Sequence, residues 1–531
     1  MRLPRWVTGL AWLIFALAVL LPLGQLVWEA TRVDGHWDLN PFRELLLTQR
    51  QWQLLQNSLL LAGGASGIAL ILGVPLAFFI QKTDLWGRSL FSLAYLSPLL
   101  IPPYIQAIVW SHLLAPENVI NAFFMNVLGW QTAPFSAYGL PGASFVLGLA
   151  YSPFITLLTI SGFKSMERRY EEAALLQQGT WRTLVSITLP LLLPHIIAGT
   201  LFVFVFAIID FGVPDILRVR VYSIEIFIQL SAFYDHRAAI ILGLPLLFVT
   251  MVLMTLQVWI MRGRSYINLA DGFSGAYYYR LGKTQIPSLI VCLSIMSLSV
   301  LMPVGALLNM AGPLTTYQQS LSTSWKQIGF SYLMAIVSAG AMTILAFFIA
   351  HAMMRSSKKI RVGLEYLTQI PFAVPPMMLG LGLIKIWNRP ETTWLYSSGL
   401  IILLAYLAHF VPFTLRAVYA SLQQVHPSLE EMGWLMSARP YRVIMQIILP
   451  LVRHGLLTGF FISFVLAMGE LGVTLLVLPP GMATIPIKIY NYMHYGAEAT
   501  VAALCLILLV LQWLFSLSLL GFSAWLDKKM T

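Results

Sequence analysis

The chain has 531 residues, of which 58% are hydrophobic and only 10% are charged, and its mean hydropathy is +0.79. Soluble domains carry about 25% charged residues, so this composition excludes a set of soluble domains and makes membrane lipid the solvent for much of the chain. The net charge of +11 does not indicate a nucleic-acid partner, because basic residues also mark the cytoplasmic loops of membrane proteins.

Twelve apolar runs, each long enough to cross a bilayer as a helix, follow one another along the chain. The first six lie near residues 6–28, 55–80, 89–112, 140–163, 191–214 and 238–261. The second six lie near residues 286–310, 328–354, 364–387, 399–421, 451–478 and 499–523. The sequence therefore predicts an all-α integral membrane protein of about twelve transmembrane helices in two pseudosymmetric six-helix halves.

The first apolar run follows Arg2 and Arg5 and has some features of a signal peptide. It has no Ala-x-Ala cleavage site before the next polar segment, so we expect it to be kept as the first helix. Residues 1–265 are predicted to form the first half, 266–285 a cytoplasmic linker, and 286–531 the second half.

The distribution of lysine and arginine predicts the orientation. Loops that are cytoplasmic when the N-terminus is inside carry about twice as many of these residues as the other loops, so both termini are expected in the cytoplasm. Cys292 and Cys505 lie inside apolar runs, where we expect small core residues rather than a disulfide or a metal site.

Prolines recur at matching places in the third run of each half. They are Pro98, Pro102 and Pro103 in the first half and Pro371, Pro375 and Pro376 in the second. Proline removes a backbone donor, so we expect the third helix of each half to be broken or kinked.

The strongest signal is an internal repeat in two loops, at residues 164–190 and 422–450. The first contains Glu171-Glu172-Ala173-Ala174 and ends in Ile187-Thr188-Leu189-Pro190. The second contains Glu431-Met432-Gly433-Trp434 and ends in Ile447-Ile448-Leu449-Pro450. An offset of 260 residues relates the two loops, and it also pairs Trp181 with Tyr441 and Asp210 with Glu470.

Each loop is too long to be a simple connector. Acidic residues suit the start of a helix, and the apolar residues that follow give that helix an apolar face. Short amphipathic helices at twin positions favour docking of a two-fold symmetric partner. The alternative is a pair of helices that lie on the membrane surface and touch only lipid headgroups.

These loops resemble the EAA loop of ABC-importer permeases, which reads Glu-Ala-Ala, three residues, Gly, nine residues and Ile-x-Leu-Pro. The match covers the Glu, the Ile and the Leu-Pro in both copies. The sequence departs from the pattern at Glu172, Met432 and Gly433, and the consensus Gly is replaced by Gln177 and Ser437. The resemblance extends over nearly the whole chain, because each half looks like one permease subunit.

The resemblance implies a permease of the bacterial inner membrane that works with two copies of a cytoplasmic ABC ATPase and with an extracytoplasmic binding protein. It implies ATPase-coupling roles for Glu171, Glu172, Ala173, Gly179, Leu189, Pro190, Glu431, Gly433, Ser437, Leu449 and Pro450. Segments such as Glu470-Leu471-Gly472-Val473 and Pro479-Pro480-Gly481-Met482 look most like the iron(III), thiamine and phosphonate group. Ferric iron is the expected substrate, with thiamine or a phosphonate as the alternatives.

The chain is not expected to be an enzyme. Gly282-Lys283-Thr284 resembles the end of a phosphate-binding P-loop, but Tyr277 occupies the place of its first Gly. We therefore expect ATP to be bound by the partner subunits, with no catalytic residue, metal site or cofactor in this chain. A membrane-embedded enzyme would need a cluster of His, Asp and Glu at ligand spacing, and the sequence has none.

A secondary transporter driven by an ion gradient is the rival class. Asp84-Leu85-Trp86-Gly87-Arg88 lies between the second and third runs, where major facilitators carry an Asp-Arg-x-Gly-Arg motif, but Leu85 takes the place of an Arg. Association of the purified protein with an ATPase would separate these classes.

Several polar residues have two readings. Asp210 and Glu470 are candidates for an acidic lining of the substrate pathway, or for local caps on loose backbone amides. For His409 and Lys385, the sequence predicts lone polar side chains that lie in the core or extend their polar end toward the membrane surface. Two outer segments, 223–237 and 484–498, are rich in aromatic residues that suit either a membrane interface or contact with the binding protein.

Overall fold

The computed structural model describes residues 5–33, 36–37, 40–166, 168–261, 279–426, 428–429, 432–433 and 440–530. Ten helices in this part of the chain are long and apolar enough to span a membrane, and two bent helix pairs bring the number to twelve. Each coincides with one of the predicted runs, which confirms the predicted fold class. Cys292 and Cys505 are buried and unpaired, as expected for core residues.

The chain folds into two compact units. Unit 1 contains Met1–Leu46, Ile226–Leu247 and Ala311–Thr531, and unit 2 contains Leu47–Glu225 and Phe248–Met310. Both units therefore combine segments from the two sequence halves. Most of the predicted linker, residues 266–278, lies outside the described residues, so the predicted domain boundaries stay a prediction.

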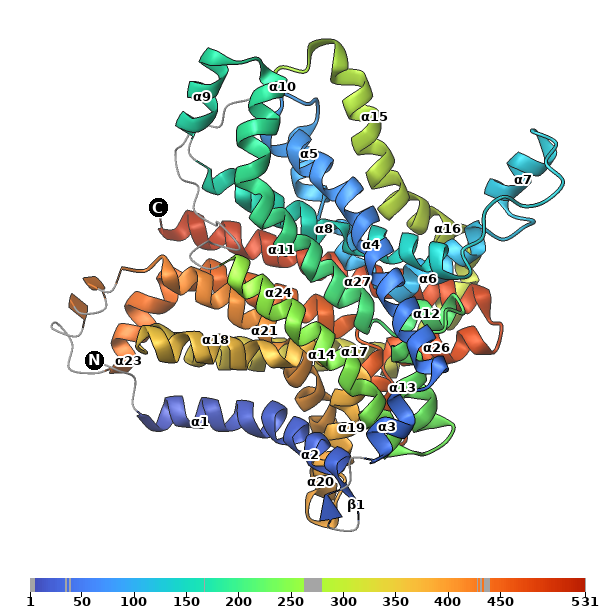
Figure 1. Ribbon diagram of the computed structural model, residues 1–531, viewed down its shortest axis with the longest axis vertical. Helices are drawn as coiled ribbons and strands as arrows, with labels where there is room; N and C mark the ends of the chain where they lie inside the picture. The colour runs from blue at the N-terminus through green and yellow to red at the C-terminus, as the bar shows by residue number, and fades with distance from the viewer. Residues whose placement is uncertain are drawn as a thin grey trace. The chain divides into compact units, whose positions relative to one another are not determined.

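Unit 2 is built around the second, fourth and fifth spans of the first half, which pack on one another as α4, α8 and α11 (Figure 1). Its α-helices are α4 (Gln49–Lys82), α5 (Arg88–Ala94), α6 (Pro103–Leu113), α7 (Val119–Asn126), α8 (Leu140–Ser165), α9 (Arg168–Gln177), α10 (Thr180–Thr183), α11 (Leu189–Ile209), α12 (Gly212–Ile216), α15 (Gln285–Met296) and α16 (Met302–Ala311). Its π and 3-10 segments are η2 (Ser97–Leu100), η3 (Leu184–Thr188), η4 (Gly282–Thr284) and η5 (Ser297–Leu301). The helices α13 (Tyr222–Ser231) and α14 (His236–Ile260) belong partly to each unit.

Unit 1 repeats this arrangement with the equivalent spans α17, α21 and α24. Its α-helices are α1 (Arg5–Phe15), α2 (Leu21–Thr31), α3 (Asn40–Leu46), α17 (Leu314–Met354), α18 (Lys358–Ala373), α19 (Pro376–Trp387), α20 (Thr393–Tyr396), α21 (Leu400–Gln423), α23 (Pro440–Val443), α24 (Leu449–Met468), α25 (Gly472–Val477), α26 (Ile485–His494) and α27 (Glu498–Met530). Its other segments are η1 (Ala16–Leu20), η6 (Pro390–Thr392), η7 (Ile444–Ile448) and a two-residue antiparallel ladder of β1 (Arg32–Val33) and β2 (His36–Trp37).

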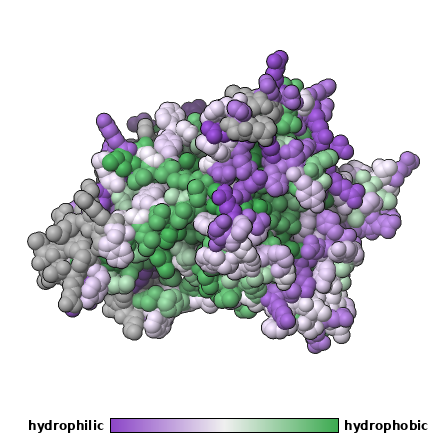
Figure 2. Space-filling view, turned by 90° about the horizontal axis from the view of Figure 1, so that it is seen from below, coloured by the Kyte–Doolittle hydropathy of each residue, from purple (hydrophilic) through white to green (hydrophobic). Residues whose placement is uncertain are grey.

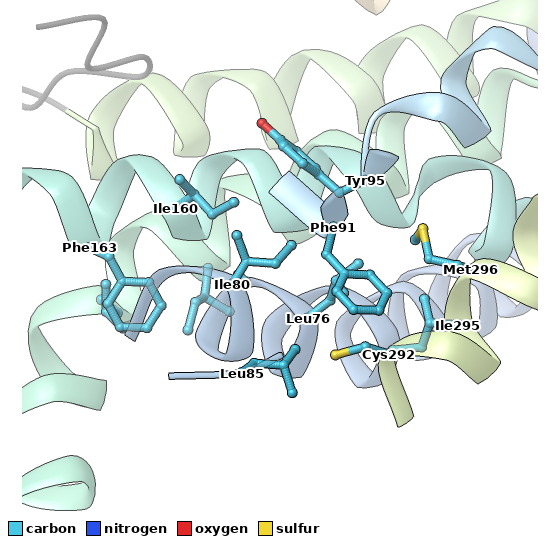
Figure 3. Packing of buried hydrophobic residues seen from close by; sticks show 13 residues of the cluster. Leu76, Ile80, Leu85, Phe91, Tyr95, Ile160, Phe163, Cys292, Ile295 and Met296 are labelled. Atoms are coloured by element: carbon cyan, nitrogen blue, oxygen red, sulfur yellow. The ribbon is translucent and has the colours of Figure 1, made fainter. Parts of the chain in front are cut away.

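The first helix of each sequence half packs with the core of the other half. In unit 2, Cys292, Ile295 and Met296 of α15 are buried in one apolar cluster with Leu76 and Ile80 of α4 (Figure 3). In unit 1, α1 contacts α17, and α2 contacts α19. This exchange of first helices was not predicted, because the repeat gives the order of the elements but not their packing partners.

The prolines of the third span break it in both halves, as predicted. The two parts of the span meet at 91° in the first half and at 99° in the second. Pro102 and Pro375 are extended N-cap residues, and Pro103 and Pro376 begin the second helix of each pair. A proline disfavours the helical conformation in the residue before it, so each Pro-Pro pair ends one helix and starts the next.

Four described π-helical segments also depend on proline. A proline stands two positions after the last residue of each of the segments η1, η3, η5 and η7. These prolines are Pro22, Pro190, Pro303 and Pro450. Proline has no N–H and its ring clashes with the carbonyl of the residue four positions earlier. A π-turn, with its wider i to i+5 pairing, lets the helix continue past that residue.

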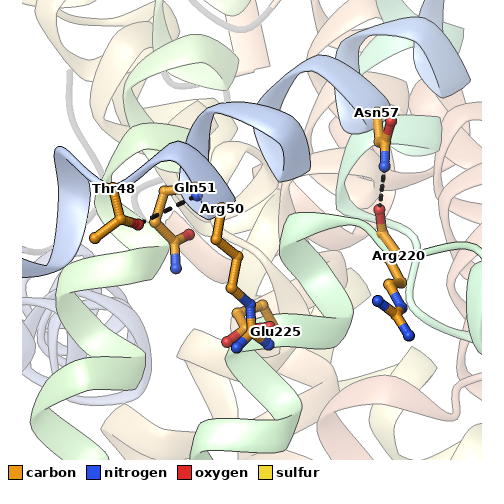
Figure 4. A network of polar contacts seen from close by, with 6 residues as sticks. All are labelled: Thr48, Arg50, Gln51, Asn57, Arg220 and Glu225. Carbon is orange, nitrogen blue, oxygen red and sulfur yellow. Dashed lines mark hydrogen bonds and ion pairs between the residues drawn. The ribbon is translucent and has the colours of Figure 1, made fainter.

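Polar contacts tie helix α13 to the start of α4 at one end of unit 2 (Figure 4). The guanidinium of Arg50 lies 2.7 Å from the buried carboxylate of Glu225, and Asn57 donates to the carbonyl oxygen of Arg220 at 2.9 Å. These contacts fix α13 and the segment before it against a membrane-spanning helix.

A serine makes the same contact in both halves. The hydroxyl of Ser58 on α4 accepts from the N–H of Tyr222 at 2.9 Å, and that of Ser331 on α17 accepts from the N–H of Ile485 at 2.7 Å. The same serine contact therefore fixes the start of α13 in the first half and of α26 in the second.

Burial, and then the charge of Glu225, raise the pKa of Tyr222 to about 12, so its phenol stays protonated at physiological pH.

Large apolar side chains remain exposed on the spanning helices. Ile71, Leu93, Ile344 and Leu517 are between 63% and 76% exposed. Figure 2 shows apolar residues gathered in a broad area on one face. Such a surface needs lipid as its solvent.

Glycines on α4 allow close contact with α8. A Cβ on Gly73 would lie 2.9 Å from the carbonyl oxygen of Ser152, whereas a Cβ on Gly67 would meet nothing within 4 Å. We expect Gly73→Ala to destabilise the detergent-solubilised protein by ~1–3 kcal/mol through overpacking. Gly67→Ala is the matched control and should stabilise it by up to ~1 kcal/mol, since alanine favours the helix.

Thermal midpoints of the two variants and the parent measure this difference. Equal midpoints for Gly73→Ala and the parent would contradict the close α4–α8 contact.

Candidate functional site

The first predicted loop, residues 164–190, is helical over most of its length. Helix α9 is followed by a two-residue break, after which α10, η3 and α11 run on as one continuous span from Thr180 to Ile209. The fifth span therefore begins earlier than the predicted residue 191. Leu176 is 89% exposed and Trp181 is 73% exposed, so the loop presents large apolar side chains to its surroundings.

The predicted coupling residues of this loop differ in exposure. Ala173, Gly179, Leu189 and Pro190 are exposed, Glu172 is half-buried, and Glu171 is buried. Gly179 is the N-cap of α10, and a Cβ there would meet nothing within 4 Å. Gly179 therefore lies at the break between α9 and α10, and no close contact at this position requires a glycine.

The second loop is described in part. Glu431 and Ser437 lie outside the described residues, Leu449 and Pro450 are half-buried, and Gly433 is buried. A Cβ on Gly433 would lie 2.4 Å from Cδ1 of Ile447. The glycine that replaces the second Ala of the EAA pattern thus lets this segment pack closely on η7.

The two loops share a pattern of exposure at the 260-residue offset. The exposed pairs are Trp181 with Tyr441, at 73% and 55%, and Val185 with Met445, at 46% and 62%. The buried pairs are Thr183 with Val443 and Thr188 with Ile448. Residues four apart lie on one face of a helix, so each half presents one apolar patch at the same place.

Glu171 has its partners inside the chain. Its carboxylate lies 2.5 Å from Nζ of Lys82, the last residue of α4. It also accepts from the hydroxyl of Thr188 at 2.9 Å. The family resemblance implies an ATPase-coupling role for Glu171. The internal arrangement was not predicted, because Lys82 is 89 residues away along the chain.

Asp210 and Glu470 cap the short helices that follow them. The N–H of Val213 donates to Asp210 at 2.9 Å, and the N–H of Val473 donates to Glu470 at 2.6 Å. Asp210 also accepts from the hydroxyl of Tyr151 at 3.1 Å. The structure therefore supports the capping role, and a pathway role for either carboxylate stays a prediction.

Two residues that the sequence analysis treated as lone polar groups have acidic neighbours. His409 lies with Nδ1 3.4 Å from the carboxylate of Glu470, and Lys385 lies with Nζ 3.0 Å from that of Glu29. Neither residue is therefore a lone polar group, although His409 is buried, as the core interpretation predicts. No sequence spacing reveals these pairs, because each depends on which helices pack together.

The two aromatic segments contain exposed rings. Phe233 is 65% exposed, Tyr234 78% and Tyr495 84%. Lys488 on α26 donates to the carbonyl oxygen of Thr323 at 2.8 Å, which ties α26 to the start of α17. Both segments are therefore short helices held against a span and followed by exposed aromatic residues.

The described residues contain no group of three or more His, Cys, Asp or Glu side chains that could hold a metal ion. The arrangement consists instead of membrane spans, twin surface patches and turns capped by Asp210 and Glu470. Residues 69–266 and 342–531 match the family described as the binding-protein-dependent transport system inner membrane component. The two matches cover more than half of the chain. The chain belongs to this family.

Relatives cover the chain to different extents. An Fe(3+)-transport system permease protein of Haemophilus influenzae is 24% identical over 96% of this chain and 96% of its own length. A ferric transport system permease protein of Actinobacillus pleuropneumoniae is 24% identical over 87% of this chain and 69% of its own. A permease assigned to 2-aminoethylphosphonate transport in Salmonella choleraesuis is 27% identical over 34% of this chain and 68% of its own.

The chain is thus a permease subunit of an ABC importer, without catalytic activity, and it crosses the inner membrane several times. ATP hydrolysis belongs to a partner ATPase, and a binding protein is the second implied partner. This excludes the secondary transporter and the membrane-embedded enzyme.

Asp84, which opens the segment compared above with the major-facilitator motif, has a structural contact in the permease. It accepts from the N–H of Leu281 at 2.9 Å and so helps to fix the start of α15.

The capping contact of Asp210 can be separated from its charge. Asp210→Asn keeps an oxygen acceptor for the N–H of Val213, whereas Asp210→Ala removes it. We expect Asn to leave the thermal midpoint near that of the parent and Ala to cost ~0.5–2 kcal/mol.

Transport by the Asn variant then reports on the charge together with the contact of the second carboxylate oxygen with Tyr151. Normal transport per folded molecule would leave Asp210 as a cap, and a large loss in a stable protein would favour the pathway role. Equal stability of the Ala variant and the parent would contradict the capping role.

Proposed function

We propose that this permease takes ferric iron from an extracytoplasmic binding protein and passes it across the inner membrane. Two copies of a cytoplasmic ABC ATPase dock on the loops at 164–190 and 422–450, and both chain termini lie in the cytoplasm. The observation that supports ferric iron as the substrate is the extent of similarity to ferric permeases. The ferric permeases match 87% and 96% of this chain, and the phosphonate permease matches 34%.

Charge supports a cation as the substrate. Asp210 and Glu470 stand at twin positions where the fifth span of each half ends. Hard cations prefer oxygen ligands, so carboxylates near a pathway favour iron over an anion such as a phosphonate. The exposed aromatic residues Phe233, Tyr234 and Tyr495 suit contact with the binding protein.

The exposed patches support the docking sites for the ATPase. Trp181 and Val185 in the first loop, and Tyr441 and Met445 in the second, are apolar side chains that a soluble partner would bury. Their equal spacing suits two identical subunits. Since the ATPase is cytosolic, docking there also places these loops, and with them both termini, in the cytoplasm.

Removal of the two exposed rings tests the docking sites. We expect the double variant Trp181→Ala and Tyr441→Ala to lose most co-purification with the ATPase, because a buried aromatic anchor contributes ~2 kcal/mol or more to an interface. The thermal midpoint of the permease alone should not change, since both rings are exposed.

Leu93→Ala with Ile344→Ala is the matched control, because it removes two exposed apolar side chains from spans instead of from the loops. Undiminished ATPase binding in the loop variant would remove the docking role.

Uptake measurements test the substrate. Cells with and without this permease and its binding protein are given labelled iron, thiamine or 2-aminoethylphosphonate. We expect only iron uptake to fall on deletion and to return on complementation. If iron uptake is unchanged while either competitor's uptake falls, the iron assignment is wrong and the permease assignment survives.

A further inference from the structure

A buried ion pair joins the first loop to the end of a membrane-spanning helix. The side chain of Lys82 is 4% exposed and that of Glu171 is fully buried, with 2.5 Å between Nζ and the carboxylate. Glu171 is at the start of α9 and Lys82 is the last residue of α4. Neither group belongs to the exposed patch proposed for docking of the ATPase.

The pair is completed by a third element. Thr188, the last residue of η3, is buried and donates its hydroxyl to the other carboxylate oxygen of Glu171 at 2.9 Å. The ammonium of Lys82 also lies 5.5 Å from the ring centroid of Phe163, near the end of α8. The carboxylate therefore lies where α4, α9 and η3 meet, and both of its oxygens are used inside the chain.

A contact of this kind resists separation. Two charges buried together stabilise one another only while both are present, and removal of one leaves the other uncompensated in a poorly solvated place. The hydroxyl bond to a charged acceptor adds to the cost. Movement of α9 away from α4 would break the ion pair, and movement away from η3 would break the hydroxyl bond, so α9 is held to both elements.

We propose that Glu171 is a positioning residue rather than a contact for the ATPase. Its carboxylate locks the coupling helix α9 to Lys82 of α4 and to Thr188 at the start of the fifth span. A displacement applied to the exposed face of α9 then reaches both spans together. This inference rests on the proposed docking of the ATPase on the loop at 164–190, where Leu176 and Trp181 are exposed and the carboxylate of Glu171 is buried.

The second half carries the same charges in sequence. Arg355 stands 273 residues after Lys82, the offset that also relates Ser58 to Ser331, and Glu431 is the repeat counterpart of Glu171. Glu431 lies outside the described residues, so the test uses the first half and leaves the second unchanged.

The test removes Lys82, whose side chain is buried inside the permease. A nitroxide label at Leu176→Cys, in a background with Cys292→Ala and Cys505→Ala, reports the mobility of α9 in the full permease without ATPase. We expect Lys82→Met to raise the mobile fraction at least about tenfold, because the pair no longer holds α9. Lys82→Arg keeps the charge and should restore the parent spectrum.

Transport per ATP hydrolysed is measured in the complete importer with unlabelled protein. We expect Lys82→Met to lower this ratio while the ATPase stays bound, and the exchanged pair Lys82→Glu with Glu171→Lys to recover part of it. An unchanged spectrum and an unchanged ratio in Lys82→Met would overturn the proposal. If Lys82→Met does not accumulate, the uncharged pair Lys82→Met with Glu171→Gln replaces it, and an immobile label in that variant would overturn the proposal as well.

The two proposals fail separately. Loss of the docking role would appear as normal ATPase binding after removal of Trp181 and Tyr441. The label spectrum is recorded without the ATPase, so it tests the Lys82–Glu171 contact whether or not the docking role holds.

Discussion

A backbone amide or carbonyl that enters the hydrocarbon of a membrane must be hydrogen bonded within the protein, because lipid offers no partner. This constraint explains how the chain uses its prolines. Four of them follow a π-turn that lets the helix continue, at Pro22, Pro190, Pro303 and Pro450. Where the third span of each half has two consecutive prolines, the helix instead breaks and restarts at about a right angle.

The same constraint explains the acidic residues at the far ends of the fifth spans. Helices α11 and α24 end at Ile209 and Met468, and new short helices begin within a few residues. The first amides of a helix have no partner in the helix itself. Asp210 and Glu470 accept from such amides three residues later, so a carboxylate in an apolar protein has a structural use before any role in transport.

The two loops at 164–190 and 422–450 combine an exposed patch with buried residues beneath it. Trp181 and Tyr441 lie at the surface, whereas Thr188, Ile448 and Glu171 lie beneath it. In both halves the Leu-Pro end of the family motif directly follows a π-turn, η3 or η7, which carries part of the patch and continues into the spanning helix. A partner bound to the patch therefore acts on a segment that is continuous with the fifth span and, in the first half, tied to the second span through Lys82.

The sequence by itself determined the twelve spans, their two-fold repeat, the breaks at the paired prolines and the two loops that mark the permease family. These are local signals: apolar length, proline chemistry and the offset of 260 residues between the two loops can be read from the sequence without any knowledge of contacts. The tertiary structure decided the exchange of first helices between the halves, since apolar helix faces of equal composition do not specify which helices they pack against. It also decided the partners of Glu171, Lys385 and His409, because an ion pair depends on which helices pack side by side, and no spacing along the chain encodes that.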